Sequence, residues 1–363
     1  MTWLKPGKTV KNLALASTSE DGLLKEVLTP REIKNADYTS VLGEARDFVS
    51  RGLDRVHDHM EAVARNAPGR LSSYMQDLLT RRGKRIRSTF ILLLAQTGGE
   101  FDLDRAARVC ASVELVHLGS LIHDDIIDGS DLRRNEKTAH QKWGNHMAVL
   151  LGDYILAKSM EIIWGDPDSR IPLSISRASS RLIKAEVLEV ERAGRLDLTL
   201  SEYHEIIAGK TAALFEACGE CGALLAGFDD SGSRRGGALG RDFGIAFQIV
   251  DDLLDFGIGA VHLDKRTFAD VKNGFLTLPL ILFFAHCSPE ERSQMLVLLE
   301  NPQVEANQIT LRALLNEHSA FQKAHEMALE KLLSGQAFLE SLPESPAALH
   351  LRQLCMLMTQ RTV

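Results

Sequence analysis

Apolar residues recur at helical spacing along almost the whole chain. This periodicity predicts helices over residues 42–64, 70–80, 84–97, 103–128, 138–163, 170–194, 201–227, 232–256, 275–286 and 311–340. Strand-like alternation of apolar and polar residues is nowhere sustained. With 363 residues and 45% apolar content, the chain can bury one large core. We therefore expect an all-α protein, a single large helical bundle.

The first 40 residues differ in character from the rest. Residues 16–22 are polar, whereas residues 29–32 form a capping box with Pro30 at the first helical position, which predicts an extra helix. We expect an N-terminal extension over residues 1–40 and the helical domain over residues 41–363. The extension lacks the apolar core of a signal peptide, and no apolar run reaches the roughly 18–20 residues of a membrane span.

Two acidic motifs interrupt apolar helices, DDIID at residues 124–128 and DDLLD at residues 251–255. Helical positions i and i+4 share a face about 6 Å apart along the axis. Asp124 and Asp128 therefore point the same way, as do Asp251 and Asp255. Burying unneutralised carboxylates is costly, so two such faces predict a shared cluster of divalent cations. Oxygen-only ligands favour Mg²⁺, which completes its shell with water and phosphate oxygens.

Basic residues accompany these motifs although the chain as a whole is acidic, with a net charge of −7. They occur at residues 81–87, at Arg133 and Arg134, at Lys210, and at Lys265 and Lys272. Because the basic groups are local, they indicate a pocket for small phosphorylated molecules. A nucleic-acid-binding role is disfavoured, since no basic stripe with interleaved aromatics is present.

Simpler readings of the same residues were weighed. A solvated charged face is typical of one acidic motif, but both motifs here lie among apolar residues. A calcium loop starting at Asp124 fails at Ile126 and Asn135, which stand where ligands are required. Cys218 and Cys221 form a lone CxxC whose small neighbours predict close helix packing, and five cysteines suggest reduced thiols in a cytoplasmic protein.

Two histidines precede the first acidic motif on the same predicted helix. His117 lies about two turns before Asp124 and on roughly the same face, which favours a phosphate contact. For His123, a core position and a ligand position stay equally open.

In chain order, these residues resemble the trans-isoprenyl diphosphate synthases. The resemblance covers roughly residues 45–360 and rests on Gly83-Lys84-Arg85-Ile86-Arg87, His117, both acidic motifs, Arg133-Arg134, Gly209-Lys210-Thr211, Phe247-Gln248 and Lys265. Three positions depart from the family pattern. Arg82 and Asp264 replace glycines, where they can alter loop geometry near the phosphates, and Ser88 replaces a proline.

The resemblance implies an isoprenoid-synthase fold with a central cavity and a magnesium-dependent prenyltransferase. Such an enzyme condenses an allylic prenyl diphosphate with isopentenyl diphosphate and releases diphosphate. Lys84, Arg87, His117 and Arg134 would hold isopentenyl diphosphate. Asp124, Asp128 and Asp251 would bind Mg²⁺, three ions per active site, with Asp125 and Asp255 as ligands or close neighbours. Arg133, Lys210, Thr211, Gln248 and Lys265 would contact the allylic diphosphate, and Arg133, Lys210 and Lys265 would act catalytically.

The chemistry explains why these residue types are needed. Breaking the allylic C–O bond leaves a carbocation and a diphosphate whose negative charge grows in the transition state, so fixed cations favour the reaction. Arginine binds phosphate oxygens bidentately and keeps its proton. No covalent nucleophile is required.

The length of the product should depend on the residues four and five positions before Asp124, where the growing chain must pass. Here they are Ser120 and Gly119, whereas aromatic residues at these places block the tunnel in short-chain members of the resembling family. An open tunnel predicts a long-chain product, and the alternative is that these small residues only allow close helix packing.

Other functions were kept open. They are a regulatory subunit of a heteromeric prenyl synthase, a short-chain synthase with fifteen- to twenty-carbon products, and a class I terpene cyclase. The cyclase is disfavoured because it needs only one diphosphate pocket, whereas a second is indicated by Lys84, Arg87, His117 and Arg134. The resemblance also implies a homodimer, and peripheral contact with a membrane would let a long product leave.

Overall fold

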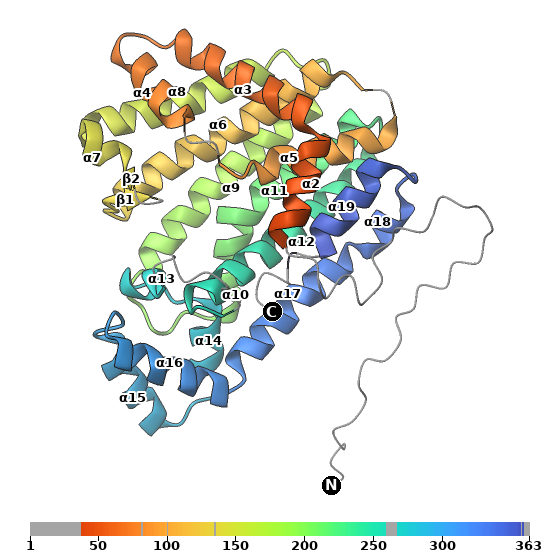
Figure 1. Ribbon diagram of the computed structural model, residues 1–363. Helices are drawn as coiled ribbons and strands as arrows, with labels where there is room; N and C mark the ends of the chain where they lie inside the picture. The colour runs from red at the N-terminus through yellow and green to blue at the C-terminus, as the bar shows by residue number, and fades with distance from the viewer. Residues whose placement is uncertain are drawn as a thin grey trace, which may run out of the picture. The chain divides into compact units, whose positions relative to one another are not determined.

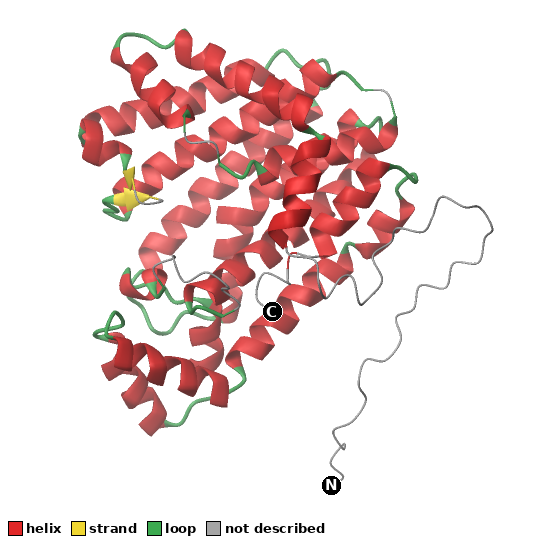
Figure 2. Ribbon diagram, in the orientation of Figure 1, coloured by secondary structure: helices red, strands yellow, loops and turns green. Residues whose placement is uncertain are grey.

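Helices make up nearly all of the part of the chain that the structure describes. The computed structural model describes residues 38–80, 83–99, 101–133, 136–258, 267–356 and 358, all within the unit Ala36–Val363 (Figure 1). Within these ranges the strands are β1 and β2, one short antiparallel pair (Figure 2). The all-α prediction is therefore confirmed.

The bounds of the elements are as follows. The first half contains α2 (Tyr38–Phe48), α3 (Ser50–Arg65), α4 (Arg70–Leu79), α5 (Ile86–Ala95), the 3-10 turn η1 (Gln96–Gly98), α6 (Leu103–Ile127), β1 (Leu132–Arg133), β2 (Glu136–Lys137), α7 (Ala139–Trp143) and α8 (Asn145–Ile163). The second half contains α9 (Arg170–Arg192), α10 (Leu200–Ile207), the π turn η2 (Ala208–Ala212), α11 (Ala213–Leu225), α12 (Asp230–Asp255), α13 (Ala269–Lys272), α14 (Leu278–Phe284), α15 (Pro289–Leu299), α16 (Glu305–Glu317), α17 (Ala320–Ser334), α18 (Gln336–Ser341) and α19 (Pro346–Met356).

The centre of the core is the pair α11 and α12, which pack along one another (Figure 1). Glycines make this close approach possible. A Cβ atom added to Gly219 would lie 1.9 Å from the carbonyl oxygen of Gly236, and one added to Gly240 would lie 2.1 Å from that of Phe215. The rings of Phe90, Phe215 and Phe243 fill the space between this pair and α5.

Cys218 and Cys221 lie on α11 in this packed region. Both are buried free thiols, and burial raises the pKa of each. The close-packing interpretation of the CxxC sequence is therefore confirmed.

Three predicted helices are wrong as single elements. Residues 42–64 divide between α2 and α3 at Val49, whose ψ of 16° departs from the helical value of about −42°. Residues 138–163 divide between α7 and α8 at Gly144, where φ is +81°. Residues 311–340 divide between α16 and α17 at Ser319, which has a left-handed φ of 54°.

Three further helices, α13, α15 and α19, were not predicted. The prediction for the N-terminal extension, with its capping box, lies outside the described residues. Among the described helices, none is both long and apolar enough to cross a membrane.

Candidate functional site

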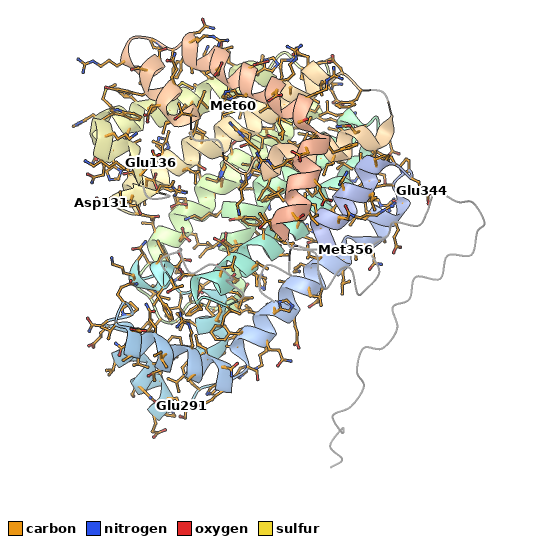
Figure 3. The ribbon with its side chains drawn as sticks, viewed as in Figure 1. Met60, Asp131, Glu136, Glu291, Glu344 and Met356 are labelled. Atoms are coloured by element: carbon orange, nitrogen blue, oxygen red, sulfur yellow. The ribbon has the colours of Figure 1, made fainter. Side chains whose placement is uncertain are left out.

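The first acidic motif ends α6, and the β1–β2 pair follows it directly. Asp125 is buried, and its Oδ1 accepts a hydrogen bond of 2.8 Å from Nε of Arg133. Arg133 belongs to β1 and pairs with Glu136 of β2, which is labelled in Figure 3. The hairpin thus places a predicted phosphate-binding arginine beside the motif.

Asp124 and Asp128 carry negative charge in a crowded acidic environment. Burial, together with the nearby charge of Glu186, raises the pKa of Asp124 to about 7, although Lys210 and Arg133 oppose the shift. Burial also raises the pKa of Asp128. Both carboxylates are therefore short of compensating positive charge.

Two glutamates on α9 complete this acidic environment, and the sequence analysis missed them. Nζ of Lys210 lies 3.1 Å from Oε2 of Glu186 and also donates to Glu189. Desolvation lowers the pKa of Lys210, but the two glutamates outweigh it and the net shift is upward. Burial raises the pKa of Glu189, which also senses Asp128. No sequence signal marks them, because α9 carries many charged residues and these two gain importance only when the helix packs beside the first motif.

Lys210 and Thr211 lie in the π turn η2 between α10 and α11. Gly209 lets this turn approach α9, since a Cβ there would lie 2.5 Å from Cβ of Ala185. π turns inside helices are rare and are often found at functional sites. The wide turn directs Lys210 to α9 while α11 continues into the core.

The second acidic motif is anchored by its middle carboxylate. Asp252 is buried and accepts hydrogen bonds from the hydroxyl of Tyr203 at 2.7 Å, from Nε2 of Gln248 at 3.1 Å and from the N–H of Leu278 at 3.2 Å. The hydroxyl of Thr211 donates to Oε1 of Gln248 at 2.7 Å. Burial still raises the pKa of Asp252 to about 7. Thr211 and Gln248 are thus joined to the motif by one hydrogen-bond network.

Asp270, a residue that was not predicted, connects the two motifs electrostatically. Burial raises its pKa to about 8, together with the nearby charges of Asp255, Asp252, Asp251 and, more weakly, Glu189. Asp255 accepts hydrogen bonds from the N–H groups of Ala269, at 2.9 Å, and of Asp270, at 3.3 Å. The charge of Asp128 raises the pKa of Glu189, and the charge of Glu189 raises the pKa of Asp270. The two motifs therefore border one acidic region.

The predicted isopentenyl diphosphate residues start α5 and continue on α6. Cζ of Arg87 lies 4.6 Å from the centre of the Phe215 ring, and burial lowers the pKa of this arginine. Its Nε has no hydrogen-bond partner among the described residues. Lys84 is exposed and His117 is half-buried on α6. Arg134 and Lys265, also predicted to bind phosphate, lie outside the described residues.

The residues predicted to set product length face different neighbours. A Cβ on Gly119 would lie 2.9 Å from Cγ of Leu156 on α8, so this glycine permits close helix packing. The buried hydroxyl of Ser120 donates to the carbonyl oxygen of His117 at 2.9 Å. His123, whose role was left open, places Nε2 3.3 Å from the carbonyl oxygen of Val149. A role in product length stays a prediction.

The donor set fits hard divalent cations whose shells are completed by substrate. In the part of the chain described, no three Asp, Glu, His or Cys side chains converge closely enough to hold a metal by themselves. Mg²⁺, however, is commonly held by one or two carboxylates together with substrate phosphates and water. The raised pKa values of Asp124, Asp128 and Asp270 show where added positive charge would be favourable.

Comparison with known proteins gives a consistent result. The family model described as Polyprenyl synthetase matches residues 68–317. Heptaprenyl diphosphate synthase component 2 of Geobacillus stearothermophilus is 31% identical over 86% of this chain and 97% of its own. A short chain isoprenyl diphosphate synthase of Methanothermobacter thermautotrophicus is 33% identical over 79% of this chain and 89% of its own.

Solved structures agree. A decaprenyl diphosphate synthase from Rhodobacter capsulatus superposes with a TM-score of 0.81 at 28% identity, covering 89% of this chain and 99% of the other. A polyprenyl synthase from Caulobacter crescentus CB15, solved in complex with calcium and isoprenyl diphosphate, gives 0.75 at 29% identity, covering 90% and 98%.

Proposed function

Because the chain belongs to the polyprenyl synthetase family, we propose that it condenses an allylic prenyl diphosphate head to tail with isopentenyl diphosphate, releasing diphosphate. Prenyl diphosphate synthesis is the activity that the family supports. The observation that carries the proposal is the acidic region shared by Asp124, Asp128, Asp251 and Asp270, with Arg133 and Lys210 beside it.

Asp124, Asp128 and Asp251 would hold Mg²⁺, with three ions per site and with Asp125 and Asp255 as close neighbours. Bound there, the ions would stabilise the negative charge that grows on the departing diphosphate. Asp125 and Asp255 are assigned to the surroundings of the ions because each already accepts a hydrogen bond from a protein group.

The chain's own residues bind, orient and compensate charge. Arg133 and Lys210 lie near Asp124 and would contact the allylic diphosphate, together with Thr211, Gln248 and Lys265. Lys210 pairs with Glu186 and Glu189, so it would exchange these partners for phosphate oxygens when a diphosphate binds. Lys84, Arg87, His117 and Arg134 would hold isopentenyl diphosphate within reach of the cation. Water must be excluded, or it would capture the carbocation.

The decisive experiment measures diphosphate release by the purified chain with Mg²⁺, an allylic diphosphate and isopentenyl diphosphate. Asp124→Ala and Asp251→Ala should each abolish turnover, and a chelator should abolish it reversibly. Asp58→Ala removes a carboxylate from the exposed surface of α3 and is the matched control, expected to be fully active. Wild-type turnover in chelator, or full turnover in either site variant, would contradict the proposal.

A regulatory role in a heteromeric synthase is the second candidate. It is raised by the relative that carries the words "component 2" in its name. Both acidic motifs are complete here, which favours a chain that is active alone. Silence of the pure chain, followed by activity when a partner chain is added, would favour the heteromeric candidate.

We propose a long-chain product on the basis of the small residues Gly119 and Ser120. Ser120→Phe is the better test, since Gly119→Phe would clash with Leu156 of α8. Mass analysis of the products should show shorter chains for Ser120→Phe than for wild type. An unchanged product would remove the argument and favour a short-chain synthase or a limit set elsewhere.

We propose a homodimer formed through α9. One face of this helix is buried in the core, yet Ile183, Val187 and Val190 on another face are at least half exposed, at 58%, 54% and 50%. They follow the i, i+4, i+7 spacing of one helix face, and a helix that is apolar on several sides is normally covered. A second copy of the chain would cover it. Peripheral membrane contact and a cytoplasmic location remain predictions.

Light scattering should give the mass of a dimer for wild type and of a monomer for the double variant Ile183→Glu, Val187→Glu. Val297→Glu alters a similarly exposed residue on α15 and should leave the dimer intact. A wild-type monomer at micromolar concentration would refute this assembly.

A further inference from the structure

Glu114 is a buried carboxylate on α6 that binds the start of α5. Its side chain is 8% exposed. Oε1 accepts hydrogen bonds from the N–H of Ser88 at 3.2 Å and from its hydroxyl at 2.7 Å. Oε2 accepts one from Nη1 of Arg85 at 3.1 Å. All three donors come from the short segment that contains Arg87 and follows Lys84.

The backbone of this segment needs such support. Arg85 has left-handed dihedral angles, φ 52° and ψ 36°, which are unfavourable for a residue with a side chain. Besides Glu114, its guanidinium contacts Sδ of Met60 on α3 at 3.0 Å, a residue labelled in Figure 3. Its carbonyl oxygen accepts hydrogen bonds from the N–H and the hydroxyl of Thr89, both at 2.9 Å. The turn is therefore held on both sides of its strained residue.

Ser88 supplies two of the three donors to Glu114. It is fully buried in the first turn of α5. A proline at this position would have neither an N–H nor a hydroxyl, so the carboxylate would keep only Arg85. A buried carboxylate that loses hydrogen bonds is left with an uncompensated desolvation penalty. The pairing with Ser88 thus fixes how α5 begins.

Glu114 also links the two elements that carry the residues predicted to bind isopentenyl diphosphate. It lies one turn before His117 on α6, whereas its partners lie between or beside Lys84 and Arg87 on α5. Asp124 is ten residues further along the same helix, which corresponds to about 15 Å. A substitution at Glu114 should therefore weaken the binding of isopentenyl diphosphate much more than the binding of the allylic substrate.

We propose that Glu114 and Ser88 are positioning residues for isopentenyl diphosphate. They hold the turn at Arg85 so that Lys84, just before α5, and Arg87, in its first turn, face His117 on α6. This inference rests on the proposed function, because that function defines the pocket.

The test combines kinetics with direct binding. Glu114→Gln keeps the shape and removes the charge that pairs with Arg85. Ser88→Ala removes the hydroxyl, and Ser88→Pro removes both donors in the first turn of α5. We expect the KM for isopentenyl diphosphate to rise about fivefold for Ser88→Ala, which is typical of a single hydrogen bond, and about tenfold or more for the other two, where the range for hydrogen bonds to charged groups begins. The kcat and the KM for the allylic substrate should stay within about twofold of wild type.

Ser112→Ala is the matched control. It removes a buried serine hydroxyl from the same helix, where the hydroxyl donates to the carbonyl oxygen of Ser159 at 2.8 Å, far from the α5 turn. Ser88→Thr keeps both donors, so its KM for isopentenyl diphosphate should stay close to that of wild type. Equal increases in both KM values, no change for Glu114→Gln, or an equal effect of Ser112→Ala would each overturn the inference.

Calorimetric titration with isopentenyl diphosphate alone separates this inference from the proposed function. If wild type binds this ligand but releases no diphosphate once Mg²⁺ and an allylic diphosphate are added, the proposed reaction fails, and a weaker affinity of Glu114→Gln still supports the positioning role. If wild type does not bind it, the positioning role is refuted as well.

Discussion

Replacing Gly219 by alanine should separate the two central helices. The added Cβ would lie 1.9 Å from the carbonyl oxygen of Gly236 on α12, whereas such a carbon and oxygen ordinarily approach only to about 3.3–3.6 Å. The opposing atom belongs to the backbone and cannot rotate away. Overpacking of this kind costs about 1–3 kcal/mol, and the better helix propensity of alanine recovers about 1 kcal/mol. We expect a net loss of about 1–2 kcal/mol, because the contact lies at the severe end.

Thermal unfolding measures this loss. Domains of 150–250 residues lose about 2–4 °C in Tm per kcal/mol, so a decrease of a few degrees is expected. Gly43→Ala is the matched control, since Gly43 lies in α2 and a Cβ there would meet no atom within 4 Å. It should leave the Tm unchanged or raise it. A Gly219→Ala protein as stable as wild type would refute the close approach of α11 and α12.

The same substitution should also reduce turnover. Thr211 lies just before α11 and Gln248 lies on α12, and the 2.7 Å hydrogen bond between their side chains spans the two helices. Moving the helices apart lengthens this bond and disturbs the network around Asp252. Gly43→Ala should retain wild-type turnover.

Two further predictions concern stability. Tyr203→Phe removes the 2.7 Å hydrogen bond to the buried carboxylate of Asp252 and should lower the free energy of unfolding in urea by about 1.5–3 kcal/mol; an unchanged midpoint would show that this bond contributes nothing. Burial lowers the pKa of His350 on α19, so below its unfolded pKa of about 6.5 the unfolded chain binds protons that the folded protein does not. Wild type should therefore lose stability relative to His350→Leu as the pH falls from about 7.5 to 5.5, and a constant difference would contradict the shift.

Periodicity located most helices because each buries a stripe of apolar residues. The helix over residues 103–128, for example, is α6 within one residue at its C-terminal end. The breaks at Val49 and Ser319 were missed because they depend on backbone dihedral angles that neither residue type suggests. The break at Gly144 carried a glycine signal that the strong apolar pattern on both sides obscured.

The acidic motifs and the basic residues could be predicted because their residue types are unusual within apolar helices. Glu186, Glu189 and Asp270 could not, since their importance arises only when α9 and α13 fold against the two motifs. The middle aspartate of the second motif shows the same limit. Its hydrogen bonds to Tyr203 and Gln248, which make it an anchor, form only when the helices fold together.

The helices α10 and α11 follow one another without a break, and the wide turn at Ala208–Ala212 sets how far one is rotated about the helix axis relative to the other. In helical geometry a π turn equals a regular helix with one extra residue, and each residue corresponds to a rotation of about 100°. Shortening the rod by one residue at Ala208 would allow regular hydrogen bonding throughout. The core face of α11 would keep its orientation, whereas α10 and the residues before it would rotate by about 100° around the helix axis. Such a deletion would yield a well-folded helix whose chemistry points in the wrong direction.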